Sequence, residues 1–286
     1  MRKDTVFDPR QAMANKPYEI FHYYDSYVKE VGTHHHDFYE LYCFVGGEVN
    51  YVVEGQSYSL EPGDILLISP SELHKMSATT FLKYERYVLW MSESFLKRLS
   101  SSSSDLLLPF NRAAKSGENL FRLPKTEKER ALTLLKECYS LSSRNGGYGN
   151  DILADGKIAE LLIMLETENS VGERTKSGDD DVKNKLLLYI NEHLTDPELS
   201  VERIANSVFL SKSRIMHVFK DSVDCPVHKY IIKKRLVLAK EYLAKNEQVI
   251  DVYEKCGFSD YNSFFRSFKK EYGITPKEYA KMKSGM

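Results

Sequence analysis

The stretch SDYNSFFRSFKKEYGITPKEY, residues 259–279, gathers Tyr, Phe, Lys and Arg in a chain whose formal net charge is only −1. Much of its pattern occurs once before. Laying SVERIANSVFLS (200–211) over QVIDVYEKCGFS (248–259) brings apolar residues into register at an offset of 48. Ser211 and Ser259 then coincide at the point where a new helix should be capped.

One inserted residue follows, and the match continues at an offset of 49. Ile215 and Phe219 fall on Phe264 and Phe268, and each pair has the spacing of two residues on one helix face. Each copy therefore predicts a helix, a tight turn and a capped second helix. This is the helix-turn-helix layout, present twice.

The opposite face of each second helix should be exposed to solvent. It carries Ser213, Met216, His217 and Lys220 in the first copy, and Asn262, Phe265, Arg266 and Lys269 in the second. Such side chains can reach base edges in a major groove while the cations contact phosphates. Two solvated faces of an ordinary helical bundle are the alternative, but the duplication and an exposed Phe265 beside Arg266 favour DNA.

Residues 226–246 should form one long helix between the copies, with Lys233, Lys234 and Arg235 as a positive patch. At about 1.5 Å per residue it spans roughly 30 Å, close to the ~34 Å helical turn of DNA. The distribution of charge along the chain also favours DNA binding by the C-terminal part. Residues 183–286 hold 19 Lys and Arg against 13 Asp and Glu, whereas residues 1–182 are acidic.

Residues 183–283 resemble the DNA-binding domain of AraC-type transcription regulators, and GFSDYNSFFRSFKKEYGITPKEY carries the resemblance most strongly. It implies two reading helices. The DNA-binding residues we expect are Lys212, Ser213, Arg214, Met216, His217, Lys220, Tyr261, Asn262, Phe265, Arg266 and Lys269. Three positions depart from the family pattern: Phe209 and Asp224 replace glycines, and Tyr253 replaces a small residue.

The first part of the chain predicts a different architecture. YELYCFV (39–45), EVNYVVEG (48–55), QSYSLEPGD (56–64) and DILLISP (64–70) are short strands separated by turns. Helical periodicity follows in 125–145 and 151–169. We therefore expect an α+β multidomain protein with an antiparallel, cupin-like barrel at 1–91, a helical extension at 92–168 that mediates dimerisation, a linker at 169–182 and the double helix-turn-helix domain at 183–286.

Histidines in THHHDFYELYCFVGG open a second question. His34, His36, Glu40 and the distant His74 resemble the metal-binding pattern of cupin barrels, in which alternation would place His34 and His36 on one strand face. One interpretation is a metal-dependent cupin enzyme fused to a helical interaction module. We favour the other, an effector pocket without metal, cofactor or catalysis, because the asparagine expected after the last histidine is absent.

The expected effector pocket consists of His34, His36, Glu40, His74, Tyr39, Tyr42 and Tyr51. Aromatic faces with His and Glu suit a small polar ligand such as a sugar. The resemblance further implies an activator that acts as a homodimer on double-stranded DNA half-sites and contacts RNA polymerase. Four scattered cysteines and the lack of any long apolar run indicate a reduced, cytoplasmic protein without a membrane segment.

Overall fold

A computed structural model describes residues 13–14, 16–25, 31–70, 72–78, 83–143, 147–167, 178–223 and 225–284. The chain divides into two compact units, Met1–Thr175 and Lys176–Met286. The division falls inside the expected linker, most of which lies outside the described residues. None of the helices in the described part of the chain combines the length and apolar character that crossing a membrane requires.

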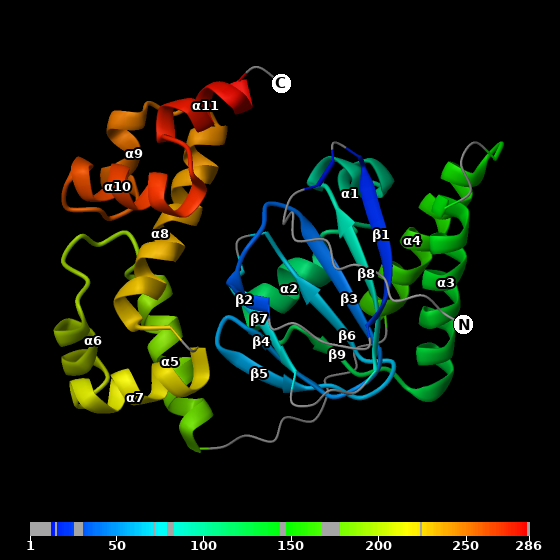
Figure 1. The fold of residues 1–286 in the computed structure, drawn as a ribbon, viewed down its shortest axis with the longest axis horizontal. Helices are drawn as coiled ribbons and strands as arrows, with labels where there is room; N and C mark the ends of the chain where they lie inside the picture. Colours follow the sequence, from blue (N-terminus) through cyan, green and yellow to red (C-terminus); the bar gives the residue numbers. More distant parts are fainter. Residues whose placement is uncertain are drawn as a thin grey trace. The chain divides into compact units, whose positions relative to one another are not determined.

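The first unit contains two antiparallel sheets (Figure 1). One has the order β1-β8-β3-β6-β9 and the other β2-β7-β4-β5. The strands are β1 (Tyr18–Asp25), β2 (Val31–His34), β3 (Tyr39–Gly46), β4 (Val49–Val53), β5 (Gln56–Ser59), β6 (Ile65–Ile68), β7 (His74–Ala78), β8 (Tyr84–Met91) and β9 (Leu120–Phe121). The expected cupin-like antiparallel fold is thus confirmed, although β9 extends the first sheet beyond residue 91.

Strand alternation gives this unit two separate cores. Leu41 and Leu89 belong to a cluster between the five-stranded sheet and the helices, whereas Tyr42 and Val88 belong to a cluster between the two sheets. Successive strand residues point to opposite faces, so β3 and β8 contribute to both clusters. Apolar residues on both faces explain why these strands read as nearly continuous hydrophobic runs.

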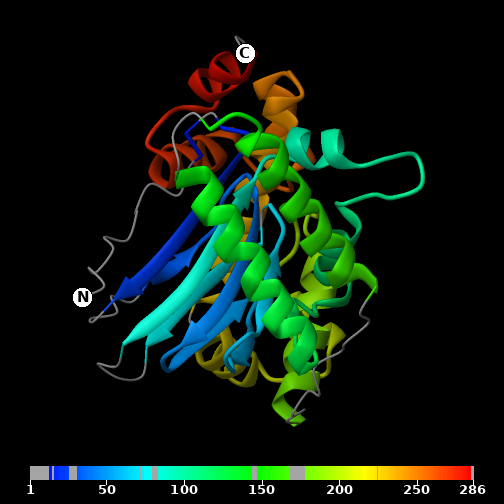
Figure 2. The ribbon, with the colours of Figure 1, turned by 90° about the vertical axis from the view of Figure 1, so that its right-hand side faces the viewer.

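Four helices complete the unit: α1 (Glu93–Leu99), α2 (Leu108–Ser116), α3 (Lys125–Ser143) and α4 (Asn150–Thr167). Figure 2 shows α3 and α4 side by side across the five-stranded sheet. Ion pairs Arg130–Glu160 and Lys157–Glu137 join the two helices. The periodicity of 125–145 and 151–169 predicted both, whereas α2 and β9 follow a Ser-rich segment and were not expected.

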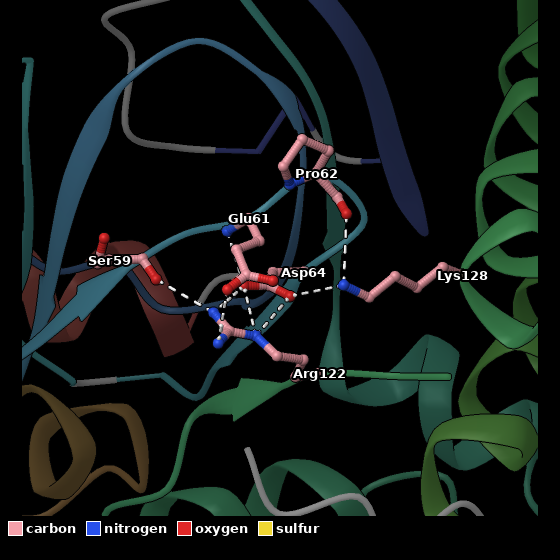
Figure 3. A network of polar contacts seen from close by, with 6 residues as sticks. All are labelled: Ser59, Glu61, Pro62, Asp64, Arg122 and Lys128. Atoms are coloured by element: carbon pink, nitrogen blue, oxygen red, sulfur yellow. Dashed lines mark hydrogen bonds and ion pairs between the residues drawn. The ribbon is translucent and has the colours of Figure 1, made fainter. Parts of the chain in front are cut away.

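A buried carboxylate links the barrel to this helical layer. Asp64, which is fully buried, ends the EPGD turn between β5 and β6 (Figure 3). It accepts hydrogen bonds from Arg122 Nη2 at 2.7 Å and from Lys128 Nζ of α3 at 3.2 Å. Its own carbonyl accepts from Phe44 N of β3. Strand β3 and helix α3 are therefore connected through one residue.

The second unit is all-helical, and its helices are α5 (Gly178–Glu192), α6 (Val201–Ser207), α7 (Lys212–Val223), α8 (Val227–Ala244), α9 (Val249–Lys255), α10 (Tyr261–Tyr272) and α11 (Pro276–Ser284). The helix-turn-helix pairs α6–α7 and α9–α10 lie at opposite ends of α8 (Figure 1). Ile215, Phe219, Phe264 and Phe268 are all fully buried, as the repeat predicts. Helix α5 begins at Gly178, inside the linker that was expected at 169–182.

Arg235 corrects one expectation. Instead of joining a positive patch with Lys233 and Lys234, its side chain is 8% exposed. Its Nε donates to Leu194 O at 2.9 Å and its Nη2 to Asp196 O at 2.7 Å. These carbonyls belong to the loop that follows α5. Arg235 therefore fastens the middle of α8 to the loop that precedes the first helix-turn-helix.

We expect Arg235→Met to lower the free energy of unfolding of the helical unit by about 1–3 kcal/mol, because the carbonyls of Leu194 and Asp196 lose a charged donor. Denaturant unfolding followed by far-UV circular dichroism measures this loss. Lys229→Met, an exposed change on the same helix, is the matched control and should shift stability by less than about 0.5 kcal/mol. Equal effects of the two changes would contradict a structural role for Arg235.

Candidate functional site

Helix α7 presents the predicted row to solvent. Lys212, Ser213, His217 and Lys220 are exposed, and Met216 is 55% exposed. Arg214 is half-buried. Ser211 caps the helix, because its Oγ accepts from Arg214 N at 3.2 Å. Lys212 forms an ion pair with Glu202 of α6.

Helix α10 repeats the arrangement with two differences. Asn262, Arg266 and Lys269 are exposed, but Phe265 is only half-exposed and its ring lies 6.0 Å from that of Tyr261. Phe265 is therefore less exposed than the sequence predicts. The cap is Asp260, whose carboxylate accepts from Ser263 N at 2.8 Å. The inserted residue displaces Ser259 from the capping position.

Different residues occupy the equivalent turns before α7 and α10. Phe209 has φ +55° and a side chain that is 94% exposed, so it adopts the left-handed conformation that disfavours residues with a Cβ. Gly257 has φ +81°, and a Cβ there would lie 2.8 Å from Leu194 O. Phe209 therefore replaces the glycine but keeps the positive φ that a glycine would adopt at this turn.

The other two departures have separate outcomes. Tyr253 is accommodated at the edge of α9, where its ring packs edge-on against Tyr261 and its hydroxyl donates to Glu254 at 2.8 Å. Its counterpart Ala205 is buried. Asp224 lies outside the described residues.

The barrel contains a pocket between its two sheets, with an empty volume of about 460 Å³ that includes the part open to solvent. Its walls are mainly aromatic and apolar, and four of the expected residues line it. The lining residues are Tyr23, Val31, His34, Glu40, Tyr42, Tyr51, Met76, Tyr84, Arg86, Val88 and Trp90.

Glu40 is the carboxylate of this pocket. It accepts hydrogen bonds from Trp90 Nε1 at 2.7 Å and Tyr51 Oη at 3.2 Å. Burial favours the neutral acid, but His36, His34 and the hydrogen bond from Trp90 together outweigh it, so the pKa of Glu40 is lowered. The group is therefore an oriented, ionised acceptor at neutral pH.

Arg86 is the buried cation of the pocket. Its Nη1 lies 2.5 Å from Asp25 Oδ2, and its guanidinium lies over the rings of Tyr84 and Tyr23. The hydroxyls of Tyr42 and Tyr84 form a hydrogen bond with each other. Burial raises the pKa of Tyr42 well above its usual range, so its hydroxyl stays protonated.

Two of the remaining expected residues border the pocket and one does not. His36 lies in the loop after β2 rather than on the strand face of His34, and with His74 it lies next to Glu40. Tyr39 does not line the pocket, contrary to the prediction. Alternation along β3 turns it to the helical side, where its ring packs edge-on against Phe110 at 5.0 Å.

Sequence reasoning missed the contribution of β8. Tyr84, Arg86, Val88 and Trp90 alternate along this strand and all line the pocket. The signal was an arginine at a period-two position inside the hydrophobic run YERYVLWM, since a buried strand rarely carries a charge without a partner.

Comparison with known proteins matches both units of the chain. Residues 16–162 match the AraC-like ligand binding domain and residues 204–282 match a helix-turn-helix domain. These features define a DNA-binding transcription regulator with an N-terminal ligand-binding domain. The chain belongs to the AraC family.

Two curated relatives match over most of their length. The probable transcriptional regulator LumQ of Photobacterium leiognathi is 26% identical over 86% of this chain and 90% of its own. The transcriptional activator RhaS of Salmonella arizonae is 25% identical over 86% of both chains. Among solved structures, the C-terminal domain of the response regulator yesN from Fusobacterium nucleatum is 31% identical over 35% of this chain and 98% of its own, with a TM-score of 0.34.

We expect Phe209→Gly to stabilise the helical unit by about 0.5–1 kcal/mol, because glycine adopts a positive φ without strain. Gly257→Ala should have the opposite sign, since its Cβ would meet Leu194 O. Far-UV circular dichroism during denaturant unfolding measures both. The fluorescence of Trp90, the one tryptophan of the chain, should be unchanged. A destabilised Phe209→Gly variant would show that the exposed ring makes a stabilising contact.

Proposed function

We propose that the chain is an effector-controlled transcription activator that acts in the cytoplasm as a homodimer, and that its two reading helices, α7 and α10, enter adjacent major grooves. The observation that carries the proposal is the pair of exposed polar and cationic rows at the two ends of α8. Helix α8 has 18 residues and so spans about 27 Å, which suits two sites separated by about one turn of DNA.

The composition of the α7 and α10 rows supports direct contact with DNA. Ser213, His217 and Asn262 offer groups that hydrogen-bond to base edges, and Arg266 can pair with guanine through two donors. Lys220 and Lys269 lie one turn further along each helix, within the reach of phosphates.

The pocket supports a sugar as the effector. Rings of Trp90, Tyr42 and Tyr51 provide faces for C–H surfaces, while Glu40 and Arg86 offer an acceptor and a donor for hydroxyl groups. The walls are more apolar than His34, His36 and His74 alone would suggest. A compact monosaccharide with one apolar face therefore fits better than a highly charged ligand.

Asp64 and the helical layer support a route from effector to DNA. A change in the barrel next to β5 and β6 reaches α3 through the Asp64–Lys128 pair.

Helix α4 presents the exposed residues Ile152 and Ile163 on the face opposite its buried residues. An apolar face of this kind supports pairing of two chains, whose linked DNA-binding units gain affinity through effective concentration. RNA polymerase is the partner that an activator requires.

We expect Arg266→Ala to cost about 1–3 kcal/mol of specific binding and to relax base preference at one position. Lys269→Ala should weaken binding to all duplexes alike and reduce the salt slope by about one unit. Binding is measured by fluorescence anisotropy on a duplex that the protein selects from a randomised library, with a scrambled duplex as control. If Arg266→Ala binds both duplexes as the parent does, α10 does not read bases.

We expect a monosaccharide to bind in the pocket, and Tyr51→Phe to weaken its binding about fivefold through loss of one hydrogen bond. Tyr39→Phe removes the same hydroxyl from the opposite face of the sheet and is the matched control. Isothermal titration against a panel of aldopentoses and aldohexoses provides the measurement. Absence of binding across the panel, or equal losses in both variants, would refute the sugar assignment.

A further inference from the structure

Three potential metal ligands from separate segments converge at one edge of the barrel pocket. They are His36 of the β2–β3 loop, Glu40 of β3 and His74 of β7. All three side chains are buried, and their ligand-type atoms lie within 4.8 Å of one another. Ligand atoms bound at 2.0–2.2 Å are separated by at most about 4.4 Å. Shifts of a few tenths of an ångström to about one ångström would therefore close the group around an ion.

Both histidines direct Nδ1 at a backbone carbonyl. The Nδ1 atom of His36 lies 2.9 Å from Phe38 O, and the Nδ1 atom of His74 lies 2.9 Å from Glu72 O. A carbonyl oxygen only accepts, so each Nδ1 must carry the proton. In the neutral ring the lone pair is then on Nε2. A backbone carbonyl that holds Nδ1–H is the usual support for a histidine that binds a metal through Nε2.

The two Nε2 atoms have no hydrogen-bond partner among the described residues, although both are buried. Glu40 Oε2 lies 3.5 Å from His36 Nε2, beyond the usual range for a hydrogen bond. Buried polar atoms are nearly always satisfied. Two such atoms facing one carboxylate therefore indicate a ligand that accepts lone pairs.

The third ligand is already oriented. Trp90 Nε1 and Tyr51 Oη both donate to the Glu40 carboxylate, which fixes its plane and leaves lone pairs available. Two imidazoles and one carboxylate suit zinc, iron or nickel, whereas calcium and magnesium prefer oxygen ligands.

We propose that His36, Glu40 and His74 hold a divalent transition-metal ion at the wall of the barrel pocket. Three protein ligands leave a coordination position for another molecule. Glu40 belongs both to this group and to the pocket lining, so an oxygen of a pocket ligand can complete the coordination. That last step rests on the effector role proposed above, whereas binding of the ion does not. His34 is outside the group, because among the described residues only the ligand-type atoms of His36, Glu40 and His74 lie within 4.8 Å of one another, and its ring packs edge-on against that of His74.

The test uses the full chain without an affinity tag, stripped with a chelator and titrated with Co²⁺. We expect one Co²⁺ per chain, with ligand-field absorption bands and saturable quenching of Trp90 fluorescence, both reversed by Zn²⁺. Mass spectrometry of metals gives the stoichiometry. His36→Gln and His74→Gln should each weaken binding by more than about 100-fold.

His35→Gln is the matched control, because His35 belongs to the same run of three histidines but not to the proposed group. It should bind Co²⁺ as the parent does. Weak binding that is lost equally in His35→Gln would indicate adventitious binding by the histidine run and overturn the proposal. So would a parent chain that shows no saturable quenching, whatever the stability of the variants. Neither result would affect DNA binding by the helical unit.

Discussion

The hydrogen bonds from Arg235 to Leu194 O and Asp196 O hold the DNA-binding unit together at one place. The same loop packs against Gly257, where any side chain would collide with its backbone. Helix α8, the start of the first helix-turn-helix and the turn of the second therefore meet at residues 194–196. Neither copy can rotate about α8 without breaking buried contacts, so the separation of α7 and α10 is set by packing rather than by a flexible connection. The proposed engagement of two grooves by one polypeptide requires this rigidity.

The ligand-binding unit depends on strand alternation in a comparable way. Strands β3 and β8 carry Tyr39, Leu41, Leu89 and Met91 on the helical side and Glu40, Tyr42, Arg86 and Trp90 on the pocket side. A ligand that displaces the pocket side chains thus acts on the same backbone that supports α3 and α4. Asp64 adds a direct connection to α3. The unit has the structural means to transmit occupancy of the pocket to its outer helical surface.

Much of this architecture could be predicted from periodicity alone. The duplicated pattern located both helix-turn-helix pairs and their four buried anchors, because helical spacing and core packing are local properties. Arg235 could not be placed in this way, since its partners are backbone carbonyls some 40 positions earlier and a cation on a helix usually faces water. The same limit applies to Arg86, whose partners Asp25 and Tyr84 come together only through pairing of β1 with β8. Tyr39 is different, because alternation along one strand already places it on the opposite face from Glu40. Non-local contacts decided the positions of Arg235 and Arg86.

The single inserted residue before α10 makes the two copies unequal. Ser211 caps α7 and Asp260 caps α10, and the outward side chains differ at every matching position except the terminal lysine. One chain consequently has no internal twofold symmetry. If both helices read bases as proposed, the duplex sequence that one chain recognises is not a palindrome and has a direction. Inverting such a site would then reverse the direction in which the bound chain faces.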